Sequence, residues 1–138
     1  MILRQVDQTD ERIDNFIREV FSVHSEEHQL VSSFKEYCFV AEDDDGNIIG
    51  AITGHSLYNE VYISELVVDP GYRGTGLGSK LIGAVEEAFT GKGFDKLTVT
   101  TYEFQAPLFY QKLGFRVEYI REDKEPKLNK YFLVKEMH

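Results

Sequence analysis

The chain has no tryptophan and a single cysteine, Cys38. One cysteine excludes an internal disulfide framework and any cysteine-rich zinc site. Because Cys38 lies in the apolar run 37–41, we expect it to be a small buried hydrophobe. No run of about 18 apolar residues is present, which excludes a transmembrane helix, and the acids that follow Met1–Gln5 exclude a signal peptide. These absences favour a soluble cytoplasmic protein.

Basic residues are also scarce. The 15 lysines and arginines face 24 aspartates and glutamates, so the formal net charge is −9. This balance argues against binding to nucleic acid or to an anionic membrane, which both require a basic face. It tolerates a cationic small molecule. The 138 residues, 42% of them hydrophobic, suit one domain over 1–138.

The hydrophobic pattern predicts alternating strands and helices. A helix capped by Thr9 or Asp10 has its apolar residues one turn apart, and a second helix is expected over 77–89. A short third helix runs from Pro107 through Leu113. Segment 24–33 is compatible with a loop or a short helix. Strands are expected over 2–6, 37–42, 47–53, 61–68, 97–101, 115–120 and 131–135.

This order of elements indicates an α/β fold with a mixed sheet rather than a bundle or a sandwich. Residues 43–46, Asp-Asp-Asp-Gly, are typical of a hairpin turn. A calcium loop fits them poorly, since ligands at alternate positions and a distal glutamate are missing.

The strongest signal is a glycine-rich segment between the strand 61–68 and the helix 77–89. Gly74, Gly76 and Gly78 alternate in it, directly after Arg73. Glycines lack the Cβ atoms that would keep a ligand off the backbone, and a helix start offers free N–H donors. The arginine adds a fixed positive charge. The segment therefore predicts an anion site, most simply for phosphate; the alternative is a tight turn without a ligand.

Two other phosphate motifs do not fit. Walker A requires Gly-Lys-Ser/Thr, whereas this chain has Gly78-Ser79-Lys80. The dinucleotide fingerprint requires a glycine where Leu77 or Ser79 stands. An ATP-binding protein is disfavoured on this ground.

The segment resembles motif A of the GCN5-related N-acetyltransferases, the GNAT superfamily, written Arg/Gln-x-x-Gly-x-Gly/Ala. Arg73, Gly76 and Gly78 match this pattern. The resemblance implies a GNAT-type acyl-CoA N-acyltransferase fold, with a mostly antiparallel sheet of about seven strands flanked by helices. It also implies acetyl-CoA as co-substrate. The residues that would hold its pyrophosphate are Arg73, Gly74, Thr75, Gly76, Leu77, Gly78 and Ser79, and the main chain of Leu66, Val67 and Val68 would bind the pantetheine arm.

A second match lies downstream. Residues 106–115, Ala-Pro-Leu-Phe-Tyr-Gln-Lys-Leu-Gly-Phe, are similar to motif B of the family, Ala-x-x-x-Tyr-x-x-x-Gly-Phe. The segment 104–110 is also similar to a branch of small bacterial GNAT proteins. Two departures concern the acceptor side: Glu103 stands where many members have asparagine, and the Gly-His loop of the branch is absent from 125–130.

Tyr110 of motif B is the candidate acid for the departing sulfur. A phenol with a pKa near 10 is a weaker acid than a thiol near 8.5, so we expect it to donate a hydrogen bond to the developing thiolate. The alternative is a tyrosine that only packs.

Glu65 is the candidate base that deprotonates the acceptor amine. Its apolar neighbours predict a buried carboxylate, and a solvated or lysine-paired one is the alternative. Glu103 and His55 are weaker candidates. No spacing of histidines or carboxylates suggests a metal.

The sequence thus predicts an enzyme that transfers acetyl from acetyl-CoA to a primary amine of a small molecule or an exposed amino group. The alternative is a non-catalytic CoA-binding module on the same fold. A homodimer is compatible with the sequence.

Overall fold

The computed structural model describes residues 1–137, which fall into two compact units, Met1–Ser33 and Phe34 onward. The first unit contains the helix α1 (Glu11–Glu27). Its N-cap is Asp10, one of the two residues predicted to cap it, and the Asp10 carboxylate accepts a hydrogen bond from the Ile13 amide at 2.9 Å. The apolar residues of α1 are exposed: Phe16, Ile17, Val20 and Phe21.

The strand predicted over 2–6 is wrong. Residues 1–6 have no regular secondary structure and pair with no strand among residues 1–137. A strand exists only through its ladder of hydrogen bonds to a neighbour, and a local apolar pattern cannot supply that neighbour. Segment 24–33, left open by its pattern, divides: α1 continues to Glu27 and the rest is irregular.

The second unit is built on a six-stranded sheet in the order β1-β2-β3-β4-β6-β5. The expected seven strands are six because residues 2–6 contribute none. All neighbouring strands are antiparallel except β3 and β4. The strands are β1 (Lys35–Glu42), β2 (Ile48–Leu57), β3 (Glu60–Val68), β4 (Lys96–Tyr102), β5 (Arg116–Arg121) and β6 (Lys130–Glu136).

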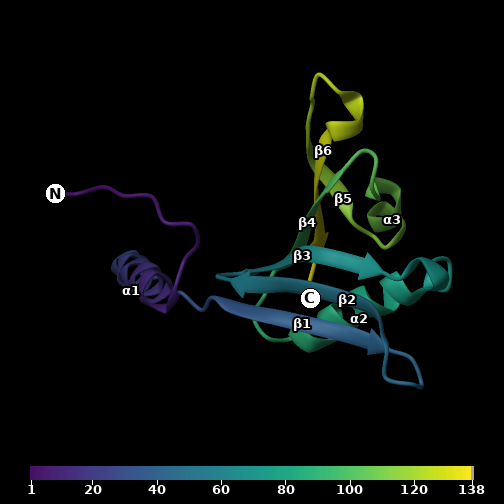
Figure 1. The fold of residues 1–138 in the computed structure, drawn as a ribbon, viewed down its shortest axis with the longest axis horizontal. Helices are drawn as coiled ribbons and strands as arrows, with labels where there is room; N and C mark the ends of the chain where they lie inside the picture. Colours follow the sequence, from purple (N-terminus) through teal and green to yellow (C-terminus); the bar gives the residue numbers. More distant parts are fainter. Residues whose placement is uncertain (138) are drawn as a thin grey trace. The chain divides into compact units, whose positions relative to one another are not determined.

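The sheet divides into two strand sets that meet at one parallel pair. The first strand set is β1-β2-β3, and the second strand set is β4-β6-β5. In Figure 1 the first set runs across the view and the second runs up it. Only four residue pairs join them, from Glu60–Lys96 to Ile63–Val99. The two sets therefore diverge beyond Ile63.

Two helices and two short 3-10 turns complete this unit: η1 (Pro70–Tyr72), α2 (Leu77–Phe89), α3 (Pro107–Lys112) and η2 (Pro126–Leu128). The bounds of α2 are those that its apolar stripe predicts. This helix packs on the first strand set, and α3 contacts β5. The buried core between helices and sheet comprises Ile52, Val61, Ile63, Leu81, Ile82, Val85, Leu97, Val99, Tyr110, Phe115 and Leu133.

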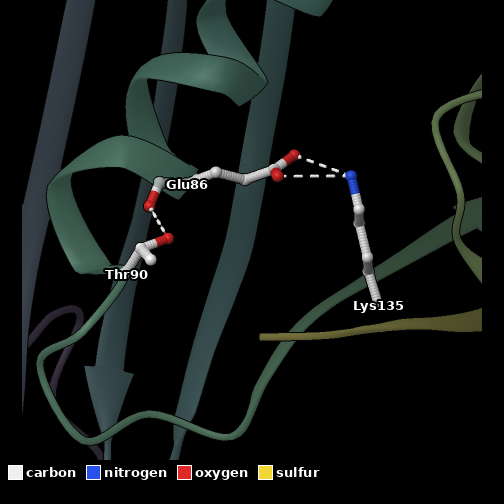
Figure 2. A network of polar contacts seen from close by, with 3 residues as sticks. All are labelled: Glu86, Thr90 and Lys135. Carbon is white, nitrogen blue, oxygen red and sulfur yellow. Dashed lines mark hydrogen bonds and ion pairs between the residues drawn. The ribbon is translucent and has the colours of Figure 1, made fainter. Parts of the chain in front are cut away.

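A partly buried ion pair connects α2 to the second strand set (Figure 2). The Lys135 ammonium on β6 lies 3.1 and 3.2 Å from the two carboxylate oxygens of Glu86. The main-chain oxygen of Glu86 accepts a hydrogen bond from the Thr90 hydroxyl at the end of α2. Because α2 itself packs on the first strand set, this pair links the two sets on the helix side of the sheet.

The hairpin predicted around residues 43–46 is confirmed. Gly46 has a φ of +83°, and the Asp43 carboxylate accepts bonds from the amides of Asp45 and Asn47. The expected burial of Cys38 is wrong, because this cysteine is exposed. Burial alternates along β1 and places Tyr37 and Phe39 toward the core, so Cys38 faces the other way. No helix among the described residues could cross a membrane.

Candidate active site

The glycine-rich segment has the backbone shape of a ligand cradle. Gly74 and Gly76 have φ values of +76° and +84°, in the left-handed region that favours glycine. A Cβ added at either residue would meet no atom within 4 Å, so open space lies beside the main chain there. The Thr75 hydroxyl donates to the Tyr72 carbonyl at 2.5 Å and holds the turn. Positive φ explains why both residues are glycine, and the open space beside them leaves room for a ligand.

The start of α2 adds donors and charge. Its N-cap is Gly76, which offers no side-chain hydrogen bond to the first turn. The first N–H groups of a helix have no partner within it, and the helix dipole places positive charge there. Among residues 1–137 the Arg73 guanidinium forms no ion pair, and Arg73 is exposed. Backbone donors and a guanidinium therefore lie together in sequence and are available to an anion.

Gly78 has a different role from its two neighbours. A Cβ at Gly78 would lie 3.1 Å from Cζ of Phe109 on α3. The residue therefore allows α3 to approach the first turn of α2. Of the three glycines, two shape the turn and the third lets the helices pack.

The strand that leads into this turn has an unpaired side. β3 pairs with β2 as far as Val68–Gly50, but its pairing with β4 ends at Ile63–Val99. The main-chain groups of residues 64–68 that face β4 are therefore outside the ladder. This stretch includes Leu66, Val67 and Val68, whose main chain the motif A resemblance assigns to the pantetheine arm. An extended chain with amide groups could pair with this edge as a strand does.

A β-bulge lies where β3 leaves β4. Ile63 pairs with Gly54 and Glu65 pairs with Thr53, so Ser64 is the extra residue. Ser64 and Glu65 are both exposed, while Ile63 is buried. Bulges of this kind redirect side chains and are common beside active sites.

A pocket of about 450 Å³ opens at this bulge. Its charged side chains are Glu36 and Glu65, and no lysine or arginine lines it. His55, also in the wall, has its ring between those of Phe34 and Tyr62, with centroids 5.1 and 5.2 Å away. We call it the bulge pocket. Its lining is Phe34, Glu36, Tyr37, Cys38, Thr53, Gly54, His55, Ser64 and Glu65.

The expected burial of Glu65 is wrong. The carboxylate is exposed and accepts a hydrogen bond from the Thr53 hydroxyl at 3.1 Å. The apolar neighbours Leu66 and Val68 pack on the core, but the bulge turns Glu65 to the opposite face. The solvated alternative describes this residue, and its carboxylate is accessible from the bulge pocket.

Tyr110 is a buried residue of α3. Only 6% of it is exposed, and its ring lies edge-on to Phe109 and Phe115. Burial raises the pKa of Tyr110 to about 12. No hydrogen bond of its hydroxyl is present among residues 1–137, and no fully buried side-chain oxygen there lacks a partner. The hydroxyl oxygen of Tyr110 is therefore not fully enclosed by the described residues, and it is a protonated phenol at neutral pH.

Hydrogen bonds position the helix that carries Tyr110. The Gln105 side-chain oxygen accepts from the Tyr102 amide at 3.0 Å and from the Thr101 hydroxyl at 3.3 Å. The Thr101 hydroxyl in turn accepts from the Ala106 amide. The end of β4 is thus tied to the start of α3. Glu103, the departure from the family pattern before motif B, lies near the Tyr131 hydroxyl, and its carboxylate raises the pKa of Tyr131.

Sequence reasoning missed the contribution of β1. Glu36, Tyr37 and Cys38 all line the bulge pocket, together with Gly54 of β2. The signal that could have found this region is Gly54 itself, because an isolated glycine within a strand pattern suggests a bulge or a close backbone approach. Among residues 1–137 no group of histidines, cysteines and carboxylates could hold a metal ion.

Comparisons with known proteins agree with this geometry. Residues 5–115 match the acetyltransferase (GNAT) family. The chain is 37% identical to blasticidin-S acetyltransferase of Streptomyces morookaense over 73% of this chain and 75% of that protein. An acetyltransferase structure from Bacillus cereus shares the fold, with a TM-score of 0.78, 24% identity and coverage of 97% and 98%. So does PaiA N-acetyltransferase of Thermoplasma acidophilum in complex with coenzyme A (TM-score 0.61, 23% identity, coverage 94% and 80%).

Proposed function

The chain belongs to the acetyltransferase (GNAT) family, and on this premise we propose that it transfers acetyl from acetyl-CoA to an amine of a small molecule. The observation that carries the proposal is the course of β3. Its free edge at residues 64–68 leads directly into the glycine turn and the start of α2. One continuous segment thus offers an edge for an extended arm and, after it, donors for a pyrophosphate.

The residues of this segment fit acetyl-CoA. The open space beside Gly74 and Gly76, the uncapped N–H groups of α2 and the unpaired Arg73 suit two linked phosphates. We assign the pyrophosphate to Arg73–Ser79 and the pantetheine arm to Leu66–Val68. Acetyl-CoA supplies an activated thioester, so the chain has to position it and handle charge and protons.

Two side chains are proposed for the chemistry. Glu65 takes the proton of the acceptor amine, directly or through a water, because its carboxylate is open to the bulge pocket. Tyr110 donates a hydrogen bond to the developing thiolate. With a pKa of about 12 against about 8.5 for a thiol, full proton transfer from Tyr110 is uphill by about 5 kcal/mol. Tyr110 therefore stabilises the thiolate by hydrogen bonding, without ionising itself.

The function is tested by mixing the purified protein with acetyl-CoA and a panel of small amines. Free thiol should appear only when protein and a suitable amine are both present, with one acetylated amine per thiol by mass spectrometry. If acetyl-CoA binds but no amine in the panel is acetylated, the CoA-binding module is favoured instead. Light scattering of the same preparation determines whether the chain forms the homodimer with which its sequence is compatible.

We propose that the acceptor is cationic. Blasticidin-S acetyltransferase is named for a small-molecule acceptor, and the bulge pocket supplies the charge argument. Its two carboxylates face no basic residue in the lining. Attraction of this kind is screened by salt, with a Debye length of about 10 Å at 0.1 M.

The expected result is a preference for amines that carry a second positive charge, with a kcat/KM that falls as salt rises. Glu36→Gln should lower kcat/KM for a diamine about tenfold relative to a monoamine of similar length. Glu118→Gln, on β5 and outside the pocket, makes the same change in net charge and should leave that ratio unchanged. Equal ratios in both variants, or a preference for acceptors with a carboxylate, would contradict the assignment.

A further inference from the structure

A tyrosine on β1 reaches across β2 to bond the main chain of β3. Tyr37 lies opposite Gly54 in the β1–β2 ladder. Its hydroxyl donates a hydrogen bond to the Tyr62 carbonyl at 2.9 Å. Most contacts within a sheet join adjacent strands, whereas this one skips a strand. It therefore ties the outer strand of the first set directly to the strand that lies at the candidate active site.

Gly54 leaves the space through which the Tyr37 side chain reaches the Tyr62 carbonyl. A Cβ at Gly54 would lie 1.9 Å from the Tyr62 carbonyl oxygen and 2.4 Å from the Tyr37 hydroxyl. No real Cβ sits so close to other atoms, and the first of these neighbours is backbone that cannot swing aside. Any residue other than glycine would thus displace the hydroxyl from its acceptor. Gly54 and Tyr37 act together as one feature.

The hydrogen bond from Tyr37 lies where β3 stops pairing with β4 while it stays paired with β2. Tyr62 is two residues before Ser64, the extra residue of the bulge, and one residue before Ile63, where pairing with β4 ends. A bulge disrupts the ladder locally. The Tyr37 hydroxyl adds a side-chain bond at this weakened point. It thereby holds the main chain immediately before the free edge of β3.

Tyr37 is also close enough to Tyr110 to interact with it electrostatically. Burial is the main cause that raises the pKa of Tyr37, and the charge that Tyr110 would carry raises it further. Tyr37 is therefore a protonated donor at neutral pH. Its ring packs edge-on against Phe89 of α2 at 5.4 Å, which restricts the direction in which the hydroxyl points.

We propose that Tyr37 is a positioning residue for acetyl transfer, whose hydroxyl fixes the bulge of β3 and so the position of the Glu65 carboxylate relative to the thioester. The proposal rests on the proposed function, since it assigns a role within that reaction. Tyr37 acts through the Tyr62 carbonyl and the bulge. It is assigned no contact with the reacting atoms.

The test is Tyr37→Phe, which removes one hydroxyl and keeps the ring that packs on Phe89. We expect kcat to fall tenfold or more with both substrates saturating, while the Kd for acetyl-CoA stays within about threefold. Affinity should persist because the glycine turn and Arg73 are untouched. The kcat of Tyr37→Phe should be lower than that of wild type by the same factor at every pH near neutral, because the raised pKa keeps Tyr37 protonated there.

Ile82→Val is the matched control for stability. Ile82 is a buried core residue of α2 that does not line the bulge pocket, and this change is expected to lower the melting temperature without lowering kcat. If Tyr37→Phe retains wild-type kcat, or loses it only to the extent that Ile82→Val does at equal loss of melting temperature, the positioning role is refuted.

Failure of the inference and failure of the proposed function give different results. Wild-type protein that acetylates an amine while Tyr37→Phe does so equally fast refutes only the role of Tyr37. Wild-type protein that acetylates no amine refutes the proposed function. In that case Tyr37→Phe still reports on the bulge, because amide exchange of residues 63–66 should accelerate in the variant, and unchanged exchange would refute the structural part of the inference.

Discussion

Replacing Tyr110 by phenylalanine should lower kcat by roughly tenfold to 10²-fold, less than the loss of a full proton donor would, with acetyl-CoA affinity unchanged within a few-fold. The hydroxyl has no hydrogen bond within the described chain, so its removal should change the free energy of unfolding by about 1 kcal/mol at most. The ring remains between Phe109 and Phe115. A loss confined to kcat therefore identifies stabilisation of the leaving thiolate, an interaction made only as the bond breaks.

The measurement is kcat of Tyr110→Phe at saturating acetyl-CoA, with the amine that the panel identifies. Tyr119→Phe, an exposed tyrosine on β5, makes the same chemical change away from the site and should be neutral. An unchanged kcat in Tyr110→Phe, where chemistry is shown to limit the rate, would make this tyrosine a packing residue. The enzyme would then release the thiolate without a hydrogen bond from Tyr110 of α3.

Gly76→Val should weaken acetyl-CoA binding tenfold or more, which corresponds to about 1.4 kcal/mol. With φ at +84°, a β-branched side chain is strained at this position, and relief of the strain would turn the first N–H groups of α2 away from the anion. The valine would also fill the open space beside the backbone. Calorimetric titration with acetyl-CoA measures the resulting loss of affinity, to which the displaced N–H groups and the filled space both contribute.

The control must separate lost binding from backbone strain. Gly91 follows the other end of α2, has a φ of +76° and also has open space at its Cβ position. Gly91→Val therefore introduces the same kind of strain without touching the glycine turn, and its affinity for acetyl-CoA should be that of wild type. Equal affinities of a folded Gly76→Val and of Gly91→Val would contradict the pyrophosphate assignment.

Sequence patterns predicted correctly those helices and turns that short-range interactions within the segment stabilise. The helix over 77–89 was predicted with its observed bounds, because its apolar stripe and flanking glycines specify both ends. The strand over 2–6 was wrong, since strand formation depends on a partner elsewhere in the chain. The glycine turn was predicted from its three glycines and Arg73, and Tyr110 was proposed from the resemblance to motif B. Both lie in contiguous segments of the sequence.

The environment of Glu65 could not be read from its neighbours. A single extra residue, Ser64, shifts the alternation of β3 by one position and turns Glu65 away from the core. Whether a strand contains a bulge depends on its pairing with the next strand. The hydrogen bond between Tyr37 and Tyr62, 25 positions apart, likewise depends on strand pairing. The one feature of the sequence that points to it is Gly54, whose missing side chain leaves room for the Tyr37 hydroxyl.

The free edge of β3 has a consequence for solubility. Exposed strand edges recruit other chains, and proteins usually protect them with charges, prolines or short length. Leu66, Val67 and Val68 offer no such protection; instead, this edge lies inside the sheet, with β4 as the next strand. Its shielding depends on the second strand set staying attached through four parallel residue pairs, the Glu86–Lys135 ion pair and the shared core. A substitution that loosens that attachment would thus promote aggregation through residues 66–68 as well as loss of activity.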